Sequence, residues 1–281
     1  MNYIGLDEFL LSALKEDVGT GDITTNCCIP AENTSEAYFL AKEDGVICGI
    51  DIAQRVFSII DKNITVIPKM KDGDLVKKGD IIAEVFGPSR GILTGERVAL
   101  NLMQRLSGTA TATAKAVFSV AGTNTKIADT RKSTPGLRVL EKYAVRVGGG
   151  HNHRFNLSDG VLIKDNHILA AGGIRSAVNA AKTTVPHVMK IEVETETLDE
   201  VRQALEAGAD IIMLDNMSIE LMTKAVSIVS GKALTEASGN MGEKDLMEIA
   251  KTGVDFISIG ALTHSVKSLD ISLKFKKLPT F

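Results

Sequence analysis

Four short apolar runs lie between residues 188 and 260: VMKIEVET (188–195), ADIIMLDN (209–216), KALTEASG (232–239) and VDFISIG (254–260). Their first residues are about 22 positions apart, the length of one strand, one helix and two short loops. Each run is apolar at neighbouring positions, which is typical of parallel strands buried on both faces. Between two of the runs, Leu198, Val201 and Leu205 recur at helical spacing. The region is therefore predicted to repeat a strand–helix unit.

Two earlier runs extend the pattern, KIADT at 126–130 and GVLIKD at 160–165. Six such strands favour a (β/α) barrel, and a doubly wound open sheet is the alternative fold. A dinucleotide-binding fold is disfavoured, because no Gly-x-Gly-x-x-Gly motif follows the first strand.

The first 120 residues do not show this repeated strand–helix pattern. The segment LDEFLLSALKE (6–16) has apolar residues at helical spacing and is followed by the turn signal Gly19-Thr20-Gly21-Asp22. Short β-like runs separated by turns follow between Ser35 and Phe86. A helical stretch from Leu93 to Val120 is expected to join the two regions. We therefore expect an N-terminal domain over 1–110 and a catalytic domain over 111–269, with the tail 270–281 returning to the first domain.

The composition is that of an ordinary globular protein, with 44% hydrophobic and 24% charged residues among 281. The net charge of -3 disfavours a general nucleic-acid-binding surface, although a local cationic pocket is compatible with it. The sequence contains no apolar run of about 18 residues and no signal peptide, so no membrane association is expected. The three cysteines, Cys27, Cys28 and Cys48, are expected to be reduced, structural thiols in the cytoplasm.

Polar side chains end each of the six runs. They are Asp129 to Lys132, Lys164 to Asn166, Glu194, Asp215 with Asn216, Glu236 with Ser238 and Gly239, and Ser258 with Gly260. The carboxyl ends of parallel barrel strands meet at one face, and active sites lie there. A single charged residue at a strand end is usually a loop residue, but six consecutive ends that follow the repeat indicate a site.

Cationic residues gather in one window between Arg131 and Lys164, which also contains Arg138, His153 and Arg154. Arginine forks and lysine point charges suit a substrate that carries several carboxylates or phosphates. Two strand-to-helix turns, at Ser238-Gly239-Asn240 and Ser258-Ile259-Gly260, have the small residues that expose backbone N–H groups to a phosphate.

Specific motifs run nearly the whole length of the chain. In order they are Glu16-Asp17-x-Gly19-x-Gly21-Asp22-Ile-Thr24, Gly95-Glu96-Arg97 with Asn101, Ser107-Gly108, Asp129-Thr130-Arg131-Lys132, Pro135-Gly136-Leu137-Arg138, Asn152-His153-Arg154, Ile163-Lys164-Asp165-Asn166-His167, Glu192-Val193-Glu194, Leu214-Asp215-Asn216, Ser238-Gly239-Asn240 and Gly253-Val254-Asp255 with Ser258 and Gly260. With these motifs the chain resembles the quinolinate phosphoribosyltransferases, also called nicotinate-nucleotide pyrophosphorylases (carboxylating).

The resemblance implies a fold and a reaction. The fold is an N-terminal α/β sandwich domain followed by an incomplete (β/α) barrel. The reaction joins quinolinate and phosphoribosyl pyrophosphate, giving nicotinate mononucleotide, carbon dioxide and pyrophosphate in de novo NAD synthesis. It also implies Mg²⁺ carried with the pyrophosphate, no organic cofactor, and a homodimer or larger assembly with shared active sites.

The resemblance also assigns roles to residues of this chain. The residues expected to act in catalysis are Lys132, Lys164, Glu194 and Asp215. The substrate-binding set contains these four together with Arg97 from the neighbouring subunit, Thr130, Arg131, His153, Arg154, Ser238, Gly239, Asn240, Ser258, Ile259 and Gly260. Within this set the cations would clamp the carboxylates, and the two small-residue turns would hold the 5′-phosphate. Glu194 and Asp215 would contact the ribose hydroxyls or position Mg²⁺, directly or through water.

Three alternatives remain open at this stage. A related phosphoribosyltransferase-like paralogue associated with molybdenum uptake would act on another aromatic acid. A carrier module is suggested by the segment DGDLVKKGDIIAE (72–84), with Lys69 as the nearest modifiable lysine. A metal hydrolase could use His151, His153, Glu194 and Asp215, since histidines separated by one residue occur in zinc sites.

Overall fold

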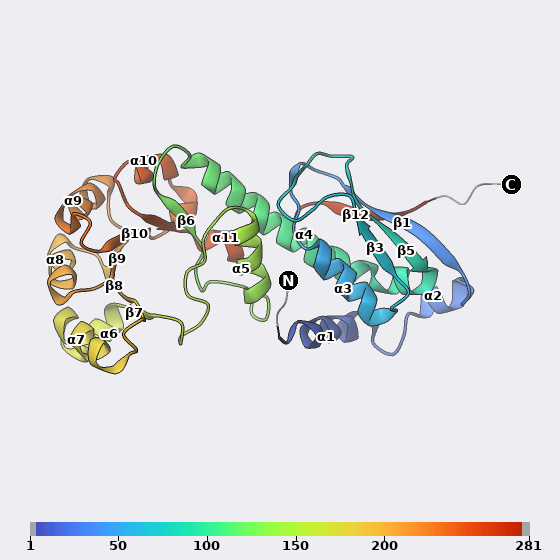
Figure 1. The fold of residues 1–281 in the computed structure, drawn as a ribbon, viewed down its shortest axis with the longest axis horizontal. Coiled ribbons are helices and arrows are strands. Elements are labelled where there is room, and N and C mark those ends of the chain that lie inside the picture. Colours follow the sequence, from blue (N-terminus) through green and yellow to red (C-terminus); the bar gives the residue numbers. More distant parts are fainter. Residues whose placement is uncertain (1–3, 277–281) are drawn as a thin grey trace. The chain divides into compact units, whose positions relative to one another are not determined.

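The computed structural model describes residues 4–276 and forms two compact units (Figure 1). The first unit runs to Ala112 and resumes at Val266, and the second spans Thr113–Ser265. Residues 277–281 of the expected C-terminal tail lie outside the described residues.

The first unit contains a four-stranded antiparallel sheet in the order β12-β1-β5-β3 and a two-stranded β2–β4 pair. Its elements are α1 (Leu6–Val18), α2 (Ile23–Cys28), β1 (Thr34–Ala41), β2 (Gly45–Val46), α3 (Ile50–Ile60), β3 (Thr65–Pro68), β4 (Leu75–Val76), β5 (Ile81–Pro88) and β12 (Ile271–Phe275), with α4 (Ser89–Ser119) continuing into the second unit. The helix expected over 6–16 is confirmed as α1, and the stretch expected over 93–120 lies in α4.

The sheet of the first unit has one face in the core. Ala37, Phe39 and Ala41 alternate along β1 and are buried, as the two-residue period of a strand requires. Helix α3 packs on this sheet and α1 packs on α3. This alternation is the pattern that the β-like runs between 35 and 86 predicted.

Helix α3 was not expected within those β-like runs. Its sequence is rich in β-branched residues, which suggests strands, yet Ala53, Val56 and Phe57 lie on one helical face and are buried. The helix begins after Gly49, which has φ 104°, a conformation that favours glycine. The carboxylate of Asp72 accepts hydrogen bonds from the N–H groups of Gly49 (2.9 Å) and Ile50 (3.2 Å), so the helix start is capped from a distant turn.

The carrier-module interpretation finds no support in this unit. Lys69 directly follows β3, and its Nζ lies 2.7 Å from a carboxylate oxygen of Glu84 on β5. The lysine is thus held on the sheet rather than presented at the tip of a hairpin.

The second unit is an α/β structure built on six parallel strands. In chain order its elements are β6 (Lys126–Ala128), α5 (Arg138–Val147), β7 (Val161–Ile163), α6 (Asp165–Ala171), α7 (Ile174–Thr184), β8 (Ile191–Thr195), α8 (Leu198–Ala207), β9 (Ile211–Asp215), α9 (Ile219–Val229), β10 (Leu234–Ser238), the 3₁₀ turn η1 (Met241–Glu243), α10 (Leu246–Ala250), β11 (Phe256–Ser258) and α11 (Ala261–His264). All six strands expected from the apolar runs are confirmed, each within its run.

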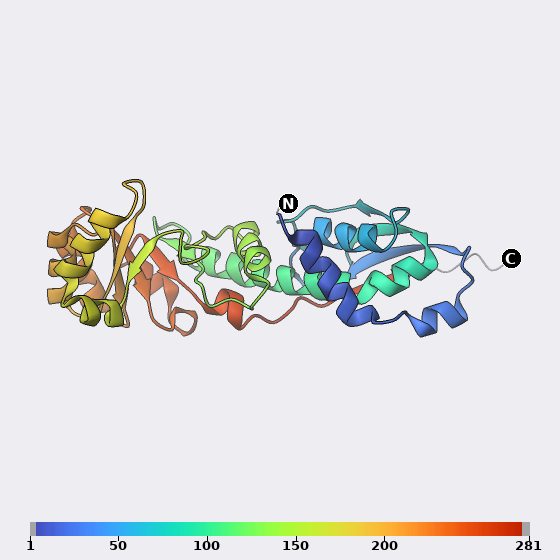
Figure 2. The same cartoon turned by 90° about the horizontal axis from the view of Figure 1, so that it is seen from below.

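The strand order β6-β11-β10-β9-β8-β7 identifies the fold. A doubly wound sheet reverses its strand order at a switch point, whereas here β7 to β11 are consecutive neighbours. Helices α7, α8 and α9 lie next to one another on the outside of these strands (Figures 1 and 2). The expected incomplete (β/α) barrel is therefore confirmed.

The opening of the barrel lies between its edge strands β6 and β7. The chain between them, residues 129–160, contains α5 and a short extended segment in which His151 pairs with Ala128 of β6. This segment places the residues that follow His151 at the barrel edge. Within residues 4–276, none of the helices combines the length and the apolar composition that a bilayer crossing requires.

Gly108 on α4 is a sensitive point of the first unit, because a Cβ there would meet the carbonyl oxygen of Lys267 and lie 3.0 Å from Cα of Ser268. We expect Gly108→Ala to lower the free energy of unfolding by about 1–3 kcal/mol through overpacking. Denaturant unfolding measures it. The control is Gly160→Ala, where a Cβ meets no atom within 4 Å. Equal stability of both variants would contradict the close approach.

Candidate active site

The register of the barrel strands places the polar side chains of the strands on the inner face. Side chains alternate along a strand, so Glu192 and Glu194 of β8 point to the same side. Asp215 pairs with Ser238 across β9 and β10, and both lie at the carboxyl ends of their strands. The strand ends that the sequence singled out therefore share one end of the barrel.

Arg131 and Arg154 form the basic centre of this end. The Nε atoms of both guanidinium groups are buried and have no hydrogen-bond partner among the described residues. Burial and the positive charge of Arg131 lower the pKa of Arg154. Arg154 also donates from Nη1 to the carbonyl of Gly160 at 2.8 Å. Two half-buried cations, each with an unused Nε donor, form a site for a ligand with anionic groups.

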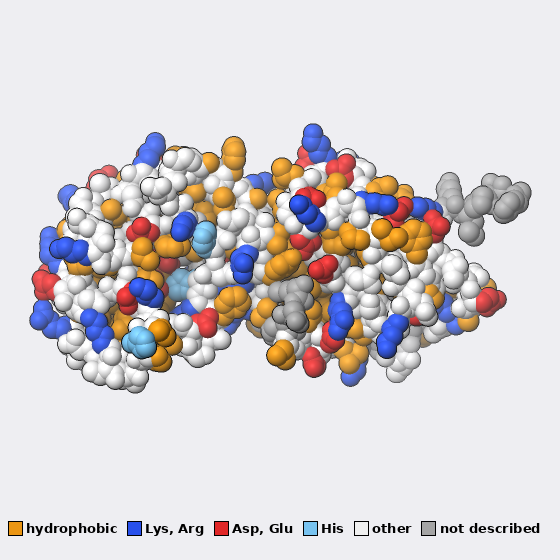
Figure 3. Space-filling view, in the orientation of Figure 1, with side chains coloured by type: hydrophobic (Ala, Val, Ile, Leu, Met, Phe, Trp, Pro, Cys, Tyr) orange, Lys and Arg blue, Asp and Glu red, His pale blue; other side chains and the backbone are white. Residues whose placement is uncertain are grey.

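This cationic pair is a local feature of the molecule. On the face shown in Figure 3, Lys and Arg side chains are scattered among other residues and do not merge into one basic field. Attraction for an anion at the barrel end therefore comes from these few groups, in a chain whose net charge is -3.

Lys164 and Glu194 form an ion pair at the ends of β7 and β8. The side chain of Lys164 is 45% exposed, whereas that of Glu194 is 14% exposed. The ammonium group is thus within reach of a ligand that enters from solvent, while the carboxylate holds it over the barrel end.

Two small-residue turns follow β10 and β11 at the same end of the barrel. Gly239 has φ 98° and Asn240 has φ 53°, so the turn after β10 uses the left-handed region at two successive residues. A Cβ on Gly239 would collide with the side chain of Asn216, which explains the glycine. The turn after β11 lies against Lys132, because a Cβ on Gly260 would meet Cδ of Lys132 at 3.1 Å.

The loop after β6 is also fixed to this end. The hydroxyl of Thr263 donates to the carbonyl of Lys132 at 2.7 Å, and the N–H of Lys132 donates to the hydroxyl of Thr130 at 3.0 Å. The N–H of Ile259 donates to the carbonyl of Ala128 at 2.9 Å. These bonds connect the ends of β6 and β11, and they bring Lys132 beside the Ser258-Ile259-Gly260 turn.

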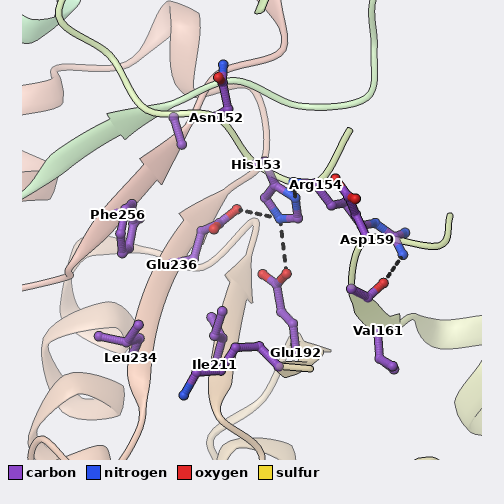
Figure 4. A pocket seen from close by; sticks show the side chains of 13 residues that line it. Asn152, His153, Arg154, Asp159, Val161, Glu192, Ile211, Leu234, Glu236 and Phe256 are labelled. Atoms are coloured by element: carbon purple, nitrogen blue, oxygen red, sulfur yellow. Dashed lines mark hydrogen bonds and ion pairs between the residues drawn. The ribbon is translucent and has the colours of Figure 1, made fainter. Parts of the chain in front are cut away.

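His153 lies deeper in the barrel, between two buried carboxylates (Figure 4). Its Nε2 is 3.0 Å from Glu192 and 3.7 Å from Glu236. Its Nδ1 accepts a hydrogen bond from the backbone N–H of Arg154 at 2.8 Å. In the neutral ring the proton is therefore on Nε2 and is donated to Glu192. Although burial alone would lower it, the hydrogen bond to Glu192 and the two negative charges raise the pKa of His153.

These three residues line a cavity of about 250 Å³, whose far wall is made by Ile211, Leu234 and Phe256 at the starts of their strands. One oxygen each of Glu192 and Glu236 faces no hydrogen-bond donor among the described residues. Burial and the neighbouring charge of Glu192 raise the pKa of Glu236 to about 7.

Within residues 4–276, one group of three or more potential metal ligands is close enough to bind an ion, and it consists of His153, Glu192 and Glu236. The hydrogen bonding opposes a metal there, because Nε2 carries the proton while Nδ1 accepts from Arg154. The hydrolase interpretation required His151, His153, Glu194 and Asp215, but only His153 belongs to this group.

The structure assembles most residues that the sequence singled out at one end of the second unit. Arg131, Lys132, His153, Arg154, Lys164, Glu194 and Asp215 come from strand ends or from the segments that follow them, as do both small-residue turns. Arg97 is different, because it is exposed on α4 in the first unit. The roles expected for these residues remain predictions.

Sequence analysis assigned no role to Glu192 and gave Glu236 only as a strand-end residue. The signal was present, because each lies two positions before a polar strand-end residue, Glu194 or Ser238, and so faces the same side. Their meeting at His153 depends on the path of the segment that crosses the barrel opening, and strand periodicity contains no information on that path.

Glu236 should make stability depend on pH. Its folded pKa of about 7 lies above the unfolded value of about 4.3, so the folded chain binds more protons in that window and stability falls as the pH rises through it. We expect Glu236→Gln to remove this fall and to gain about 1–3 kcal/mol over the parent chain between pH 5 and pH 8. Unfolding free energies at both pH values test it. The exposed Glu243→Gln is the control, and parallel pH profiles for parent and Glu236→Gln would contradict it.

The chain is similar to known proteins along its length. Residues 22–107 match the family model of the quinolinate phosphoribosyl transferase N-terminal domain, and residues 109–274 match that of the C-terminal domain. A probable nicotinate-nucleotide pyrophosphorylase [carboxylating] of Bacillus subtilis is 49% identical over 97% of this chain and 94% of its own. A chloroplastic nicotinate-nucleotide pyrophosphorylase [carboxylating] of Arabidopsis thaliana is 47% identical over 93% of this chain and 80% of its own.

The fold comparison agrees. The solved structure of the nicotinate-nucleotide pyrophosphorylase from Francisella tularensis superposes with a TM-score of 0.93 at 45% identity, covering 96% of each chain. The two family models cover both halves of the chain, and the relatives match it along nearly its whole length. The chain therefore belongs to the quinolinate phosphoribosyltransferase family.

Proposed function

We propose that this chain transfers the phosphoribosyl group of phosphoribosyl pyrophosphate to quinolinate with loss of carbon dioxide. The products are nicotinate mononucleotide and pyrophosphate, a step of de novo NAD synthesis. Family membership supports the reaction, and the observation that carries it is the pair of half-buried arginines, Arg131 and Arg154, whose Nε donors are unused among the described residues. A pyridine with two neighbouring carboxylates supplies two anionic partners for two adjacent cations.

In this proposal, different residues bind the carboxylates of quinolinate and the phosphates of the cosubstrate. Arg131, Arg154 and Lys164 hold the quinolinate carboxylates, and His153, whose two ring nitrogens both have protein partners, supports the backbone of Arg154. Lys132 and Thr130 lie on the loop after β6 and face the sugar phosphate. The turns at Ser238-Gly239-Asn240 and Ser258-Ile259-Gly260 bind the 5′-phosphate. The left-handed conformations of Gly239 and Asn240 favour this in the first turn, and the second turn would bind without the N–H of Ile259, which already donates to the carbonyl of Ala128.

The protein needs no nucleophile of its own, because the pyridine nitrogen attacks the anomeric carbon. Catalysis comes from positioning and from charges placed before the reaction begins. Glu194 and Asp215 contact the ribose, and their carboxylates favour the positive charge that develops there. After transfer, the cationic nitrogen stabilises the carbanion left when the neighbouring carboxylate departs as carbon dioxide, and this carbanion takes a proton from water to give the product. Transfer therefore precedes decarboxylation.

Mg²⁺ accompanies phosphoribosyl pyrophosphate in this proposal. Glu194 and Asp215, on neighbouring strands, supply the carboxylate oxygens that this ion prefers, and they would hold it directly or through water. When bound, the ion neutralises charge on the leaving pyrophosphate.

We also propose a homodimer with shared sites and a cytoplasmic location. Arg97 is exposed on α4 and would reach the active site of the neighbouring copy. All three cysteines are free, which fits a reducing compartment.

The first test is stoichiometry. With quinolinate, phosphoribosyl pyrophosphate and Mg²⁺, we expect equal amounts of nicotinate mononucleotide, pyrophosphate and carbon dioxide. No labelled carbon dioxide should form without the cosubstrate. Turnover of another aromatic acid in preference to quinolinate would favour the molybdenum-associated paralogue instead.

The second test concerns the half-buried arginines. Arg154→Lys keeps the charge but loses the planar fork, so we expect KM for quinolinate to rise about 10- to 100-fold, or about 1.4–2.7 kcal/mol. The exposed Arg202→Lys on α8 is the matched control. An unchanged KM for Arg154→Lys would remove this residue from the carboxylate clamp.

The third test concerns the shared site. Arg97→Ala and Lys164→Ala should each abolish activity, because each removes a cation from every site of a homodimer. Mixed heterodimers should regain activity, since one of their two sites then has both cations. Confirmed heterodimers without activity would show that Arg97 does not act across the subunits.

A further inference from the structure

The two arginine-bearing segments of the active site lie outside regular secondary structure. Arg131 follows β6 in the loop 129–137, and Arg154 follows the short bridge at His151. Loops of this kind take their position from contacts with their surroundings. The two guanidinium groups carry the same charge, and the pKa of Arg154 is lowered first by burial and then by the charge of Arg131. Some other part of the chain must therefore hold the segments together.

Helix α5 provides these contacts through the guanidinium group of Arg138. Its Nε donates to the hydroxyl of Ser133 at 2.8 Å, and its Nη2 donates to the carbonyl of Arg131 at 3.4 Å. Its Nη1 donates to the carbonyl of Phe155 at 3.1 Å. One rigid planar group thus connects the segment of Arg131 to the segment of Arg154.

Two neighbouring side chains of α5 add further contacts to these segments. The carboxylate of Glu141 accepts from the N–H (3.0 Å) and the hydroxyl (2.8 Å) of Thr134. The ammonium group of Lys142 donates to the carbonyl of His153 at 2.8 Å and forms a fully buried ion pair with Asp129. Glu141 thus fixes Thr134 to the helix, whereas Lys142 joins Asp129 of the first segment to His153 of the second, and Asp129 also accepts directly from the N–H of His153 at 2.9 Å. The connection from Arg131 to Phe155 runs through Arg138.

We propose that Arg138 is a positioning residue, which sets the spacing of Arg131 and Arg154 so that both reach the two carboxylates of one substrate. This inference rests on the proposed function. Three of the Arg138 nitrogen atoms donate to protein oxygens, so its role is to orient the other two arginines rather than to bind the substrate. Lysine cannot replace it, because one ammonium group lacks the fork that reaches three acceptors.

The experiment compares Arg138→Lys and Arg138→Ala with Arg146→Ala, an exposed arginine on the same helix. We expect both Arg138 variants to raise KM for quinolinate by about 10- to 100-fold, with a smaller change in kcat. Guanidinium ion at millimolar concentration should restore part of the activity of Arg138→Ala and none of that of Arg154→Ala. The Arg146→Ala variant should behave like the parent chain.

A second readout reports on spacing itself. Benzene-1,2-dicarboxylate has two adjacent carboxylates and benzoate has one, and both can be tested as competitive inhibitors. Loss of spacing should weaken inhibition by the dicarboxylate at least 10-fold more than inhibition by benzoate. A purely structural role would lower the melting temperature and weaken both inhibitors alike.

The outcomes separate the two proposals. If the parent chain does not convert quinolinate, the proposed function fails whatever the variants do. If the parent chain is active and Arg138→Lys keeps its KM and its preference for the dicarboxylate, the positioning role is wrong. Loss of activity that follows loss of folding in both Arg138 variants, without guanidinium rescue, would also overturn it.

Discussion

The need to hold two like-charged side chains, Arg131 and Arg154, at one end of the barrel is the constraint on which the proposed active site depends. The Nε atoms of both groups are buried and have no hydrogen-bond partner among the described residues, which is unfavourable in a folded chain, so the surrounding structure must hold them in place. The chain does so with fixed partners: the Arg138 fork, the Asp129–Lys142 ion pair and the carbonyl of Gly160. Unpaired cations lower the free energy of unfolding of the empty site. A ligand with two carboxylates would pair with both of them, so the same groups would favour its binding.

The incomplete barrel makes this arrangement sterically feasible. A closed barrel would pair β6 with β7 and leave no path for a chain segment at its edge. Here residues 129–160 occupy that opening, so one helix, α5, can contact the loop after β6 and the segment after His151. The same opening lets His153 enter the barrel and meet Glu192 and Glu236. The basic site therefore depends on the absence of pairing between β6 and β7, because that opening admits the segment which contains its residues.

Strand–helix periodicity was sufficient to predict the six barrel strands, because parallel strands buried on both faces are apolar over consecutive residues. Polar strand ends were equally informative, since the fold brings all carboxyl ends together. Helix α3 was missed because its isoleucines and valine resemble a strand locally, and its burial pattern appears only against the sheet.

The role of Arg138 was invisible for another reason. In the sequence Arg138 is one of several basic residues between Arg131 and Lys164 and is not distinguished from them. The structure shows that its three described hydrogen bonds go to oxygen atoms of the protein itself.

The two kinds of cation at the barrel end differ in how they can respond to a substrate. Lys164 is paired with Glu194 and is half-exposed, so an incoming carboxylate must compete with an existing partner. The Nε donors of Arg131 and Arg154 have no such competitor among the described residues, and their binding energy is available in full. Recognition of the ring should therefore depend first on the arginines. In the proposed reaction Lys164 would then exchange Glu194 for the substrate, and this exchange would free the carboxylate of Glu194 to face the positive charge that develops at the ribose during transfer.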